Sequence, residues 1–213
     1  MHKDVVQIGE MLSMVERHRA WVTAGHPEVG PASNNRLSLF DAQAQPVEIS
    51  DATFEAAELI RCNLSGSIFV RCDFSAAFLM DSVLRDCTFL ECGFRKADLS
   101  SADCAGSNFT GCDMTRADLT RANLQGAILD GCDMGWSWLV DTDLRLASLE
   151  GVKLDGARLS GTKLYNTRRF RIGPLDRAVV RDVYIDSDAT GPAQSGSEAL
   201  AFLRADGEAP ASM

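Results

Sequence analysis

The sequence predicts an all-β solenoid, a chain that winds repeatedly around one continuous core. Three regularities predict this fold class. A large apolar residue, mostly Leu or Phe, occupies every fifth position from Ile49 to Leu164 without an insertion or deletion. A small residue, most often Ala or Cys, precedes each of these central residues by two positions. Glycine follows the central residue by two positions in eight of the 24 units.

One short extended segment and one turn account for each five-residue unit. An interval of five matches neither the 3.6-residue period of a helix nor the two-residue period of a strand. Alternate side chains of an extended segment share a face, so the small residue and the central residue both point inwards. The remaining positions turn the chain, and glycine is favoured in such turns.

Three units carry a recognisable motif. Residues 97–99 and 117–119 read Ala-Asp-Leu, and residues 122–124 read Ala-Asn-Leu. In these units the chain resembles the pentapeptide-repeat family, and the resemblance extends over residues 37–166. It implies a right-handed quadrilateral β-helix with four pentapeptides per coil, and therefore about six coils. Residues 20 apart should then stack, and one such series is entirely leucine: Leu59, Leu79, Leu99, Leu119, Leu139 and Leu159.

Both ends of the chain depart from the repeat and are expected to cap it. Residues 1–36 should form an N-terminal helix over 4–23 and then a linker rich in Gly, Pro and Asn. The apolar face of the helix should carry Val5, Ile8, Met11, Leu12, Val15 and Arg19 or Trp21, at near-helical spacing. Residues 167–213 should form a C-terminal cap with a strand over 178–185, a short helix over 197–204 and a frayed tail. Caps are expected because an open coil exposes unpaired backbone groups and apolar core.

The charge of the chain argues against two kinds of partner. There are 21 Lys and Arg against 30 Asp and Glu, which gives a net charge of −9. Direct binding of nucleic acid or of an anionic membrane surface needs a basic footprint, so neither is expected. The sequence has no apolar run long enough to span a bilayer and no uninterrupted secretory core at its N-terminus. A cytoplasmic location is therefore expected.

Catalytic and metal-binding signatures are absent from the sequence. Six of the seven cysteines occupy the small inward position and Cys104 occupies a central one. Cysteines in a straight stack cannot surround a metal tetrahedrally, and the stacking distance of about 4.8 Å exceeds the Cβ separation of a disulfide. The three histidines, His2, His18 and His26, precede the coils and cannot activate a thiol within them. We expect a non-catalytic protein without metal or cofactor.

One side of the coil is expected to be the most acidic, with five acids against Arg71. Regularly spaced carboxylates on a stiff rod would imitate the phosphates of duplex DNA. The alternative is that these acids only maintain solubility. The candidate partner-binding acids are Glu48, Asp51, Glu91, Asp130 and Glu150.

Two groups of apolar residues occupy outward positions, where a water-facing coil would carry polar side chains. Such groups are typical of contact surfaces. The first group, near the first two coils, is either a partner site or the seat of the N-terminal helix. The second, on the fifth coil, should bind a partner or a second copy of the chain. The first group is Ile60, Ile68, Val70, Phe78 and Met80, and the second is Trp136, Trp138 and Val140.

These features favour a protein-binding module, for which two functions are considered. By its resemblance to acidic pentapeptide-repeat proteins, the rod would mimic DNA and bind a type II topoisomerase, either DNA gyrase or topoisomerase IV. It would thereby protect the enzyme from quinolones or toxins, and the resemblance also implies a homodimer. The chain differs from that subgroup in its uninterrupted coils, its N-terminal helix and its basic C-terminal end. The alternative is a structural adaptor in a bacterial assembly or secretion system that binds through the apolar groups.

Overall fold

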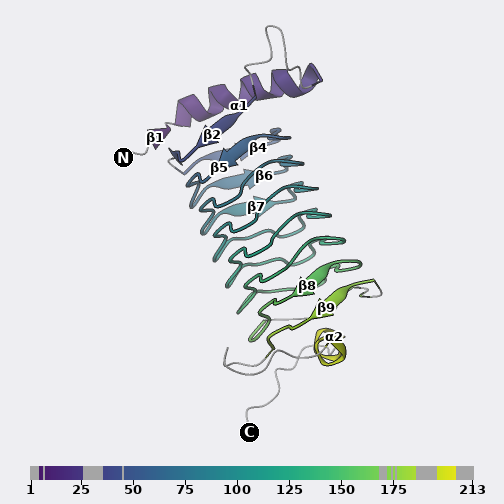
Figure 1. Ribbon diagram of the computed structural model, residues 1–213. Helices are drawn as coiled ribbons and strands as arrows, with labels where there is room; N and C mark the ends of the chain where they lie inside the picture. Colours follow the sequence, from purple (N-terminus) through teal and green to yellow (C-terminus); the bar gives the residue numbers. More distant parts are fainter. Residues whose placement is uncertain are drawn as a thin grey trace.

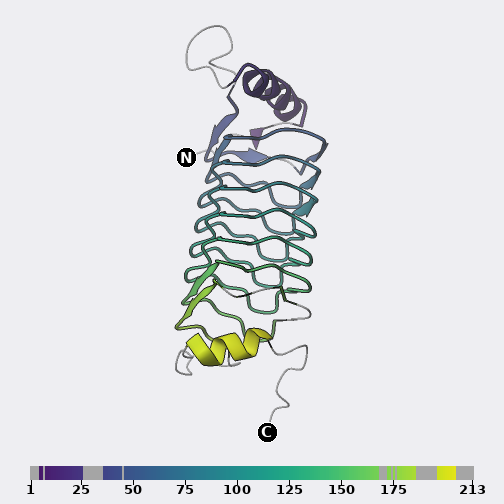
Figure 2. The same cartoon turned by 90° about the vertical axis from the view of Figure 1, so that its right-hand side faces the viewer.

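The computed structural model describes residues 5–6, 8–25, 36–44, 46–167, 172–173, 175, 177–185 and 196–204. In this part of the chain the repeat winds into a β-helix, with one helix across each end (Figure 1; Figure 2). The repeat predicted a solenoid and the resemblance to the pentapeptide-repeat family implied a quadrilateral β-helix; this fold class is confirmed.

The extended segments of the coil are short. The described strands are β1 (Val5–Val6), β2 (Ser38–Phe40), β3 (Gln43–Ala44), β4 (Glu48–Ser50), β5 (Glu58–Ile60), β6 (Ile68–Val70), β7 (Thr88–Leu90), β8 (Arg158–Ser160) and β9 (Val179–Arg181). The helices are α1 (Ile8–Thr23) and α2 (Gly196–Arg204).

Parallel backbone pairing joins residues of neighbouring coils that are 20 positions apart. Strand β2 pairs with β5, and β6 lies between β4 and β7. Where no strand is assigned, the same register continues as single bridges, such as Asp98 with Asp118. Four such ladders run along the rod, and we name the sides after the central residues of the first coil: the Ile49, Phe54, Leu59 and Leu64 sides.

Every corner of the coil has the same backbone conformation. Each fifth residue from Asp51 to Asn166 has a positive φ, at 67–72° where it is glycine and 50–62° elsewhere. Only glycine adopts this left-handed region without steric cost, which explains the eight glycines at that position. At corners such as Phe54–Ala57, a bond from the fourth residue's N–H to the first residue's carbonyl closes a turn.

The interior is filled by stacked side chains of like kind. Phenylalanines form two columns: Phe69, Phe89 and Phe109 stack nearly parallel with centroids 5.2 and 4.9 Å apart. Phe74 meets Phe89 edge-on from the neighbouring column, at 5.8 Å and 83°. These rings are 0–1% exposed, so they contribute much of the apolar area that stabilises the first half of the rod.

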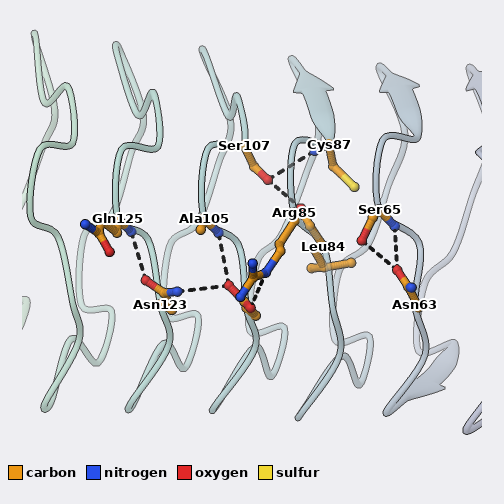
Figure 3. A network of polar contacts seen from close by, with 10 residues as sticks. Asn63, Ser65, Leu84, Arg85, Cys87, Ala105, Ser107, Asn123 and Gln125 are labelled. Atoms are coloured by element: carbon orange, nitrogen blue, oxygen red, sulfur yellow. Dashed lines mark hydrogen bonds and ion pairs between the residues drawn. The ribbon is translucent and has the colours of Figure 1, made fainter.

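The small inward residue has a second role besides its size. At most of these positions a Cys, Ser or Thr donates a hydrogen bond to a backbone carbonyl of the preceding coil, 23 residues earlier; Ser137 instead donates to Met134 O in its own turn. Examples are the Cys87 thiol to Leu64 O at 3.1 Å and the Thr142 hydroxyl to Leu119 O at 2.8 Å. In Figure 3 Ser107 accepts from the Cys87 N–H at 3.2 Å and donates to Leu84 O. Buried hydroxyls therefore tie adjacent coils together.

The winding continues beyond the regular repeat at both ends. Strand β2 pairs with β5, so the irregular residues before Val47 already form part of a coil. At the other end β9 pairs with β8 in a register of 21 residues instead of 20. The rod therefore has about seven turns, where the count of regular units predicts about six.

Helix α1 lies across the N-terminal end of the rod (Figure 1). Met11, Val15, His18 and Trp21 form its buried stripe, at helical spacing. The sequence prediction is wrong in two details. The helix begins at Ile8 instead of residue 4, because Val5–Val6 form β1 and pair with β3. Leu12, expected on the apolar face, is 43% exposed.

His18 connects α1 to the first coil. Its side chain is fully buried, its Nδ1 accepts the backbone N–H of Leu37 at 3.0 Å, and its ring stacks on Trp21 with centroids 5.4 Å apart. The Arg36 guanidinium lies over Trp21 and also over Phe78, at 5.8 and 5.7 Å from the ring centroids. The helix is thus attached by a specific polar contact as well as by apolar packing.

Helix α2 packs against β9 at the C-terminal end, with Ala199 and Leu203 buried (Figure 2). The predicted strand and helix of the C-terminal region are both present, and the helix starts one residue before the expected Ser197. The predicted linker beyond Gly25 and the predicted frayed tail lie outside the described residues.

We expect Phe89→Ala to lower the free energy of unfolding by about 3–5 kcal/mol, because it opens a cavity between two stacked rings. Urea unfolding followed by circular dichroism measures the loss. Phe78→Ala is the matched control: Phe78 is 37% exposed, so its loss should cost about 1 kcal/mol. Equal losses in the two variants would contradict the stacked core.

Candidate protein-binding surfaces

The five predicted acids lie along one side of the rod, the Ile49 side and the corner that follows it. Glu48 belongs to the ladder of β4, β6 and β7, and Asp51 follows β4 directly. The structure therefore brings the predicted set onto one side. They do not form a continuous row of free carboxylates, as the contacts of Asp51 and Asp130 show.

Arg71 neutralises the acidic side near its N-terminal end. Its guanidinium donates two hydrogen bonds to the Asp51 carboxylate, both 2.7 Å long. These bonds hold the pKa of Asp51 below its ordinary value. The pKa of Arg71 is raised by the same bonds and further by the charge of Glu91 one coil on. The charges of Asp51, Arg71 and Glu91 therefore alternate along this corner of the rod.

Three of the acids take part in local structure. Glu48 and Asp51 line a groove of about 470 Å³ between α1 and the first coil, together with Leu12 and Arg19 of the helix. Asp130 accepts the backbone N–H of Glu150 at 3.0 Å, a contact between coils. Among the described residues, no cation lies within ion-pair distance of Glu91 or Glu150.

The first apolar group does not form one surface. Ile68 and Val70 belong to β6 on the Ile49 side, whereas Phe78 belongs to the Leu59 side, two sides further round the coil. Ile60 and Met80 are half-buried on the Leu59 side. The expected patch is therefore divided between opposite sides of the rod. Helix α1 crosses the end of the rod and leaves Phe78 37% exposed.

Phe40 is an exposed aromatic residue that the sequence analysis missed. Its side chain is 52% exposed, and it pairs with Ile60 in the neighbouring coil. It belongs to an irregular unit before the recognised repeat. The 20-residue register gives the signal: Phe40 lies 20 positions before the outward residue Ile60 and should therefore point outwards as well.

The second apolar group forms one compact site. Trp136 and Trp138 are 47% and 48% exposed, and Val140 follows them on the Leu59 side. Trp136 stands at the corner between the Phe54 and Leu59 sides, and Trp138 belongs to the ladder that links Asp118 to Arg158. We call this site the tryptophan corner, consisting of Trp136 and Trp138 with Arg116, Asp118, Arg158 and Arg177.

Neighbouring coils hold the two indoles in place. The guanidinium of Arg158 lies 5.4 Å from the ring centroid of Trp138, and that of Arg177 lies 5.2 Å from Trp136. A Cβ atom on Gly156 would come within 2.6 Å of the Trp136 ring, so the indole rests directly against this glycine. Cation–π contacts of this kind favour a fixed ring orientation.

A shallow groove of about 390 Å³ opens beside the indoles, lined by Arg116, Asp118, Trp136 and Trp138. The groove combines two large apolar faces with one side chain of each charge. Such a combination suits recognition of a protein segment: the rings provide contact area and the charged groups fix orientation.

The cysteines offer no reactive centre. All seven are buried and unpaired with one another by disulfides. Burial raises the pKa of Cys87 from its ordinary 9.0 to about 11, and that of Cys132 to about 12. Within the described residues, no group of three or more His, Cys, Asp or Glu side chains is placed to hold a metal ion. No helix in the same part of the chain is both long and apolar enough to cross a membrane.

Comparison with known proteins identifies the family. A family model of pentapeptide repeats matches residues 48–86, 97–135 and 128–166, in eight copies. These segments make up just over half of the chain, and the protein belongs to the pentapeptide-repeat family. No curated protein sequence matches it.

Solved structures of pentapeptide-repeat proteins are similar at low identity. Rfr23 from the cyanobacterium Cyanothece 51142 is 23% identical over 57% of this chain and 89% of its own, with a TM-score of 0.31. Full-length QnrB1, a plasmid-mediated fluoroquinolone resistance protein, is 19% identical over 76% and 97%, with a TM-score of 0.30. HetL from Nostoc sp. strain PCC 7120, involved in heterocyst differentiation regulation, is 19% identical over 84% and 94%, with a TM-score of 0.26.

We expect the stability of the fold to fall as the pH rises above the ordinary thiol pKa of 9.0. Unfolded thiols ionise there, whereas Cys87 stays protonated in the folded state up to about pH 11 and Cys132 up to about pH 12. Urea midpoints between about pH 7 and pH 10.5 measure the slope. Cys87→Ser should fold, since Ser107 makes the equivalent bond one coil on, and should reduce the slope by one thiol's share. A flat pH profile would contradict the burial of the thiols.

Proposed function

We propose that this protein is a non-catalytic binding rod that docks a partner protein at the tryptophan corner. The observation that carries the proposal is the pair of nearly half-exposed indoles, Trp136 and Trp138, held on a rigid coil. Tryptophan is the residue type most enriched among interface residues that dominate binding energy. Arg158 and Arg177 already fix both rings, so little side-chain entropy is lost on binding.

The tryptophan corner is better suited to docking than the other surfaces. The apolar residues of the first coils are divided between opposite sides, and the acidic side is partly neutralised by Arg71. At the corner two large, nearly half-exposed aromatic faces border a groove that also carries charged groups. We also propose a reducing compartment such as the cytoplasm, because none of the seven cysteines forms a disulfide.

Mimicry of duplex DNA towards DNA gyrase or topoisomerase IV is the second candidate function. It is supported by the exposed carboxylates of Glu48, Glu91 and Glu150 along one side of a straight rod. The evidence against it is that two of the five carboxylates are not available to imitate phosphates. Asp51 is paired with Arg71, and Asp130 is half-buried and accepts the backbone N–H of Glu150.

The docking proposal predicts a site-specific partner. A photoreactive amino acid placed at Val140 should cross-link a protein in cells, whereas one at Ile128 should not. Ile128 is the matched control, because it is 39% exposed on the Ile49 side. With the purified partner, Trp136→Ala combined with Trp138→Ala should weaken binding by about tenfold or more, measured by calorimetry. Unchanged affinity in this double variant would exclude the corner as the docking site.

The mimicry candidate predicts an effect on gyrase. Micromolar protein should alter DNA supercoiling or quinolone-dependent cleavage, and the effect should weaken as salt increases. Glu91→Lys with Glu150→Lys should abolish it, whereas Trp136→Ala with Trp138→Ala should leave it intact. A DNA supercoiling assay measures the effect. If the activity of gyrase is the same with and without this protein, both in the presence and in the absence of a quinolone, the mimicry hypothesis is excluded.

A further inference from the structure

We infer that the tryptophan corner takes an acidic, extended protein segment, in which carboxylates flank an apolar residue. This inference rests on the proposed docking function and adds the chemistry of the partner. Its basis is a local reversal of charge: the whole chain carries −9, but the residues that frame the two indoles are predominantly basic.

Arg116 and Arg158 supply the uncompensated positive charge. Arg116 lines the groove in the coil before Trp136, and Arg158 pairs with Trp138 from the coil after it. Both arginines are exposed, and among the described residues neither has a carboxylate within ion-pair distance. Nearby Arg177 differs, because Asp155 binds its guanidinium at 2.7 Å.

The one acid in the groove does not cancel this charge. The Asp118 carboxylate accepts the backbone N–H of Thr120 at 2.9 Å, so one of its oxygens already serves its own turn. Lys153, further along the Phe54 side, is paired with Asp133 at 3.2 Å. Among the described residues, two guanidinium groups without an ion-pair partner face one partly engaged carboxylate, which leaves a positive surplus around the indoles.

The faces of the indoles argue against a cationic ligand. A cation would normally be attracted to the face of a tryptophan ring. Here the guanidinium groups of Arg158 and Arg177 already lie over Trp138 and Trp136, at 5.4 and 5.2 Å. A further cation in the groove would be repelled by the guanidinium of Arg158, which has no carboxylate partner among the described residues, whereas a carboxylate would be attracted by it.

The shape of the groove favours an extended segment over a globular surface patch. Its volume of about 390 Å³ is at the small end of ligand sites and holds only a few side chains. An apolar side chain can pack on the indoles while its acidic neighbours reach Arg116 on one side and Arg158 on the other. Charge complementarity of this kind fixes the position and partner choice of a bound segment.

Three six-residue peptides test the inference on the full-length protein. Each has a central Leu-Phe pair, flanked on both sides by two glutamates, two lysines or two glutamines. Binding is located by the indole N–H signals in NMR spectra, with buried Trp21 as an internal reference. The glutamate peptide should shift the signals of Trp136 and Trp138 and bind about fivefold more tightly than the other two. This preference should decrease between about 50 and 300 mM salt.

Variants separate this inference from the docking function itself. Arg116→Gln with Arg158→Gln should reduce the preference for glutamate to about twofold or less, measured by fluorescence anisotropy of labelled peptides. Arg61→Gln with Arg71→Gln removes the same charge from the first coils and should leave the preference unchanged.

Equal or tighter binding of the lysine or glutamine peptide at the indoles would overturn the inference of an acidic partner and leave the docking proposal intact. Tighter binding of a single-stranded oligonucleotide would overturn it as well. Binding of none of the peptides at the indoles would count against both proposals.

Discussion

The parallel ladder between residues 20 apart is the constraint on which the rest of this protein depends. The backbone N–H and C=O groups of each coil are hydrogen-bonded to those of the next coil. Every coil of four units must therefore contain 20 residues. A shift of one residue would turn the central side chains outwards and place outward polar residues in the core. This explains why the repeat runs from Ile49 to Leu164 without an insertion or deletion.

The ladder also explains how corners without glycine are tolerated. Left-handed conformations cost an ordinary L-residue about 1–2 kcal/mol, and residues such as Arg71 and Trp136 adopt them here. The pairing of each corner with its neighbours, together with the buried columns of Phe and Leu, offsets that cost. Because the interior is so strictly determined, outward positions are the ones free to vary, and the candidate binding surfaces are found there.

The fold could be predicted from the sequence because a five-residue period specifies the inward pair and the turn, and the resemblance to the pentapeptide-repeat family supplies the coil of four units. The inward pair, the corner glycines and the stacked leucines all follow from counting in steps of five and 20. The ends were less predictable: Val5 fits a helical stripe, yet Val5–Val6 pair as a strand with β3. His18 precedes the coils, as the sequence predicts, but nothing local in the sequence shows that the backbone N–H of Leu37 donates to it.

The binding surfaces were only partly predictable, for a related reason. Trp136 and Trp138 stand out as apolar residues at outward positions, and the 20-residue step locates Arg116 and Arg158 beside them. Arg177 could not be placed in this way, because it contacts Asp155 in a register of 22 residues where the winding is irregular. The prediction that the first apolar group forms one patch was wrong, because it relied on nearness along the chain. Ten residues make two units, so Ile68 and Phe78 lie on opposite sides of the coil.

The two end helices have a consequence for the behaviour of the protein at high concentration. A β-helix with uncovered ends could add further molecules end to end, since the unpaired backbone groups of each terminal coil could pair with another chain. Helix α1, attached through His18 and Leu37, covers one end, and α2 covers the other by packing on β9. We therefore expect the two helices to oppose end-to-end growth of the rod into a fibre.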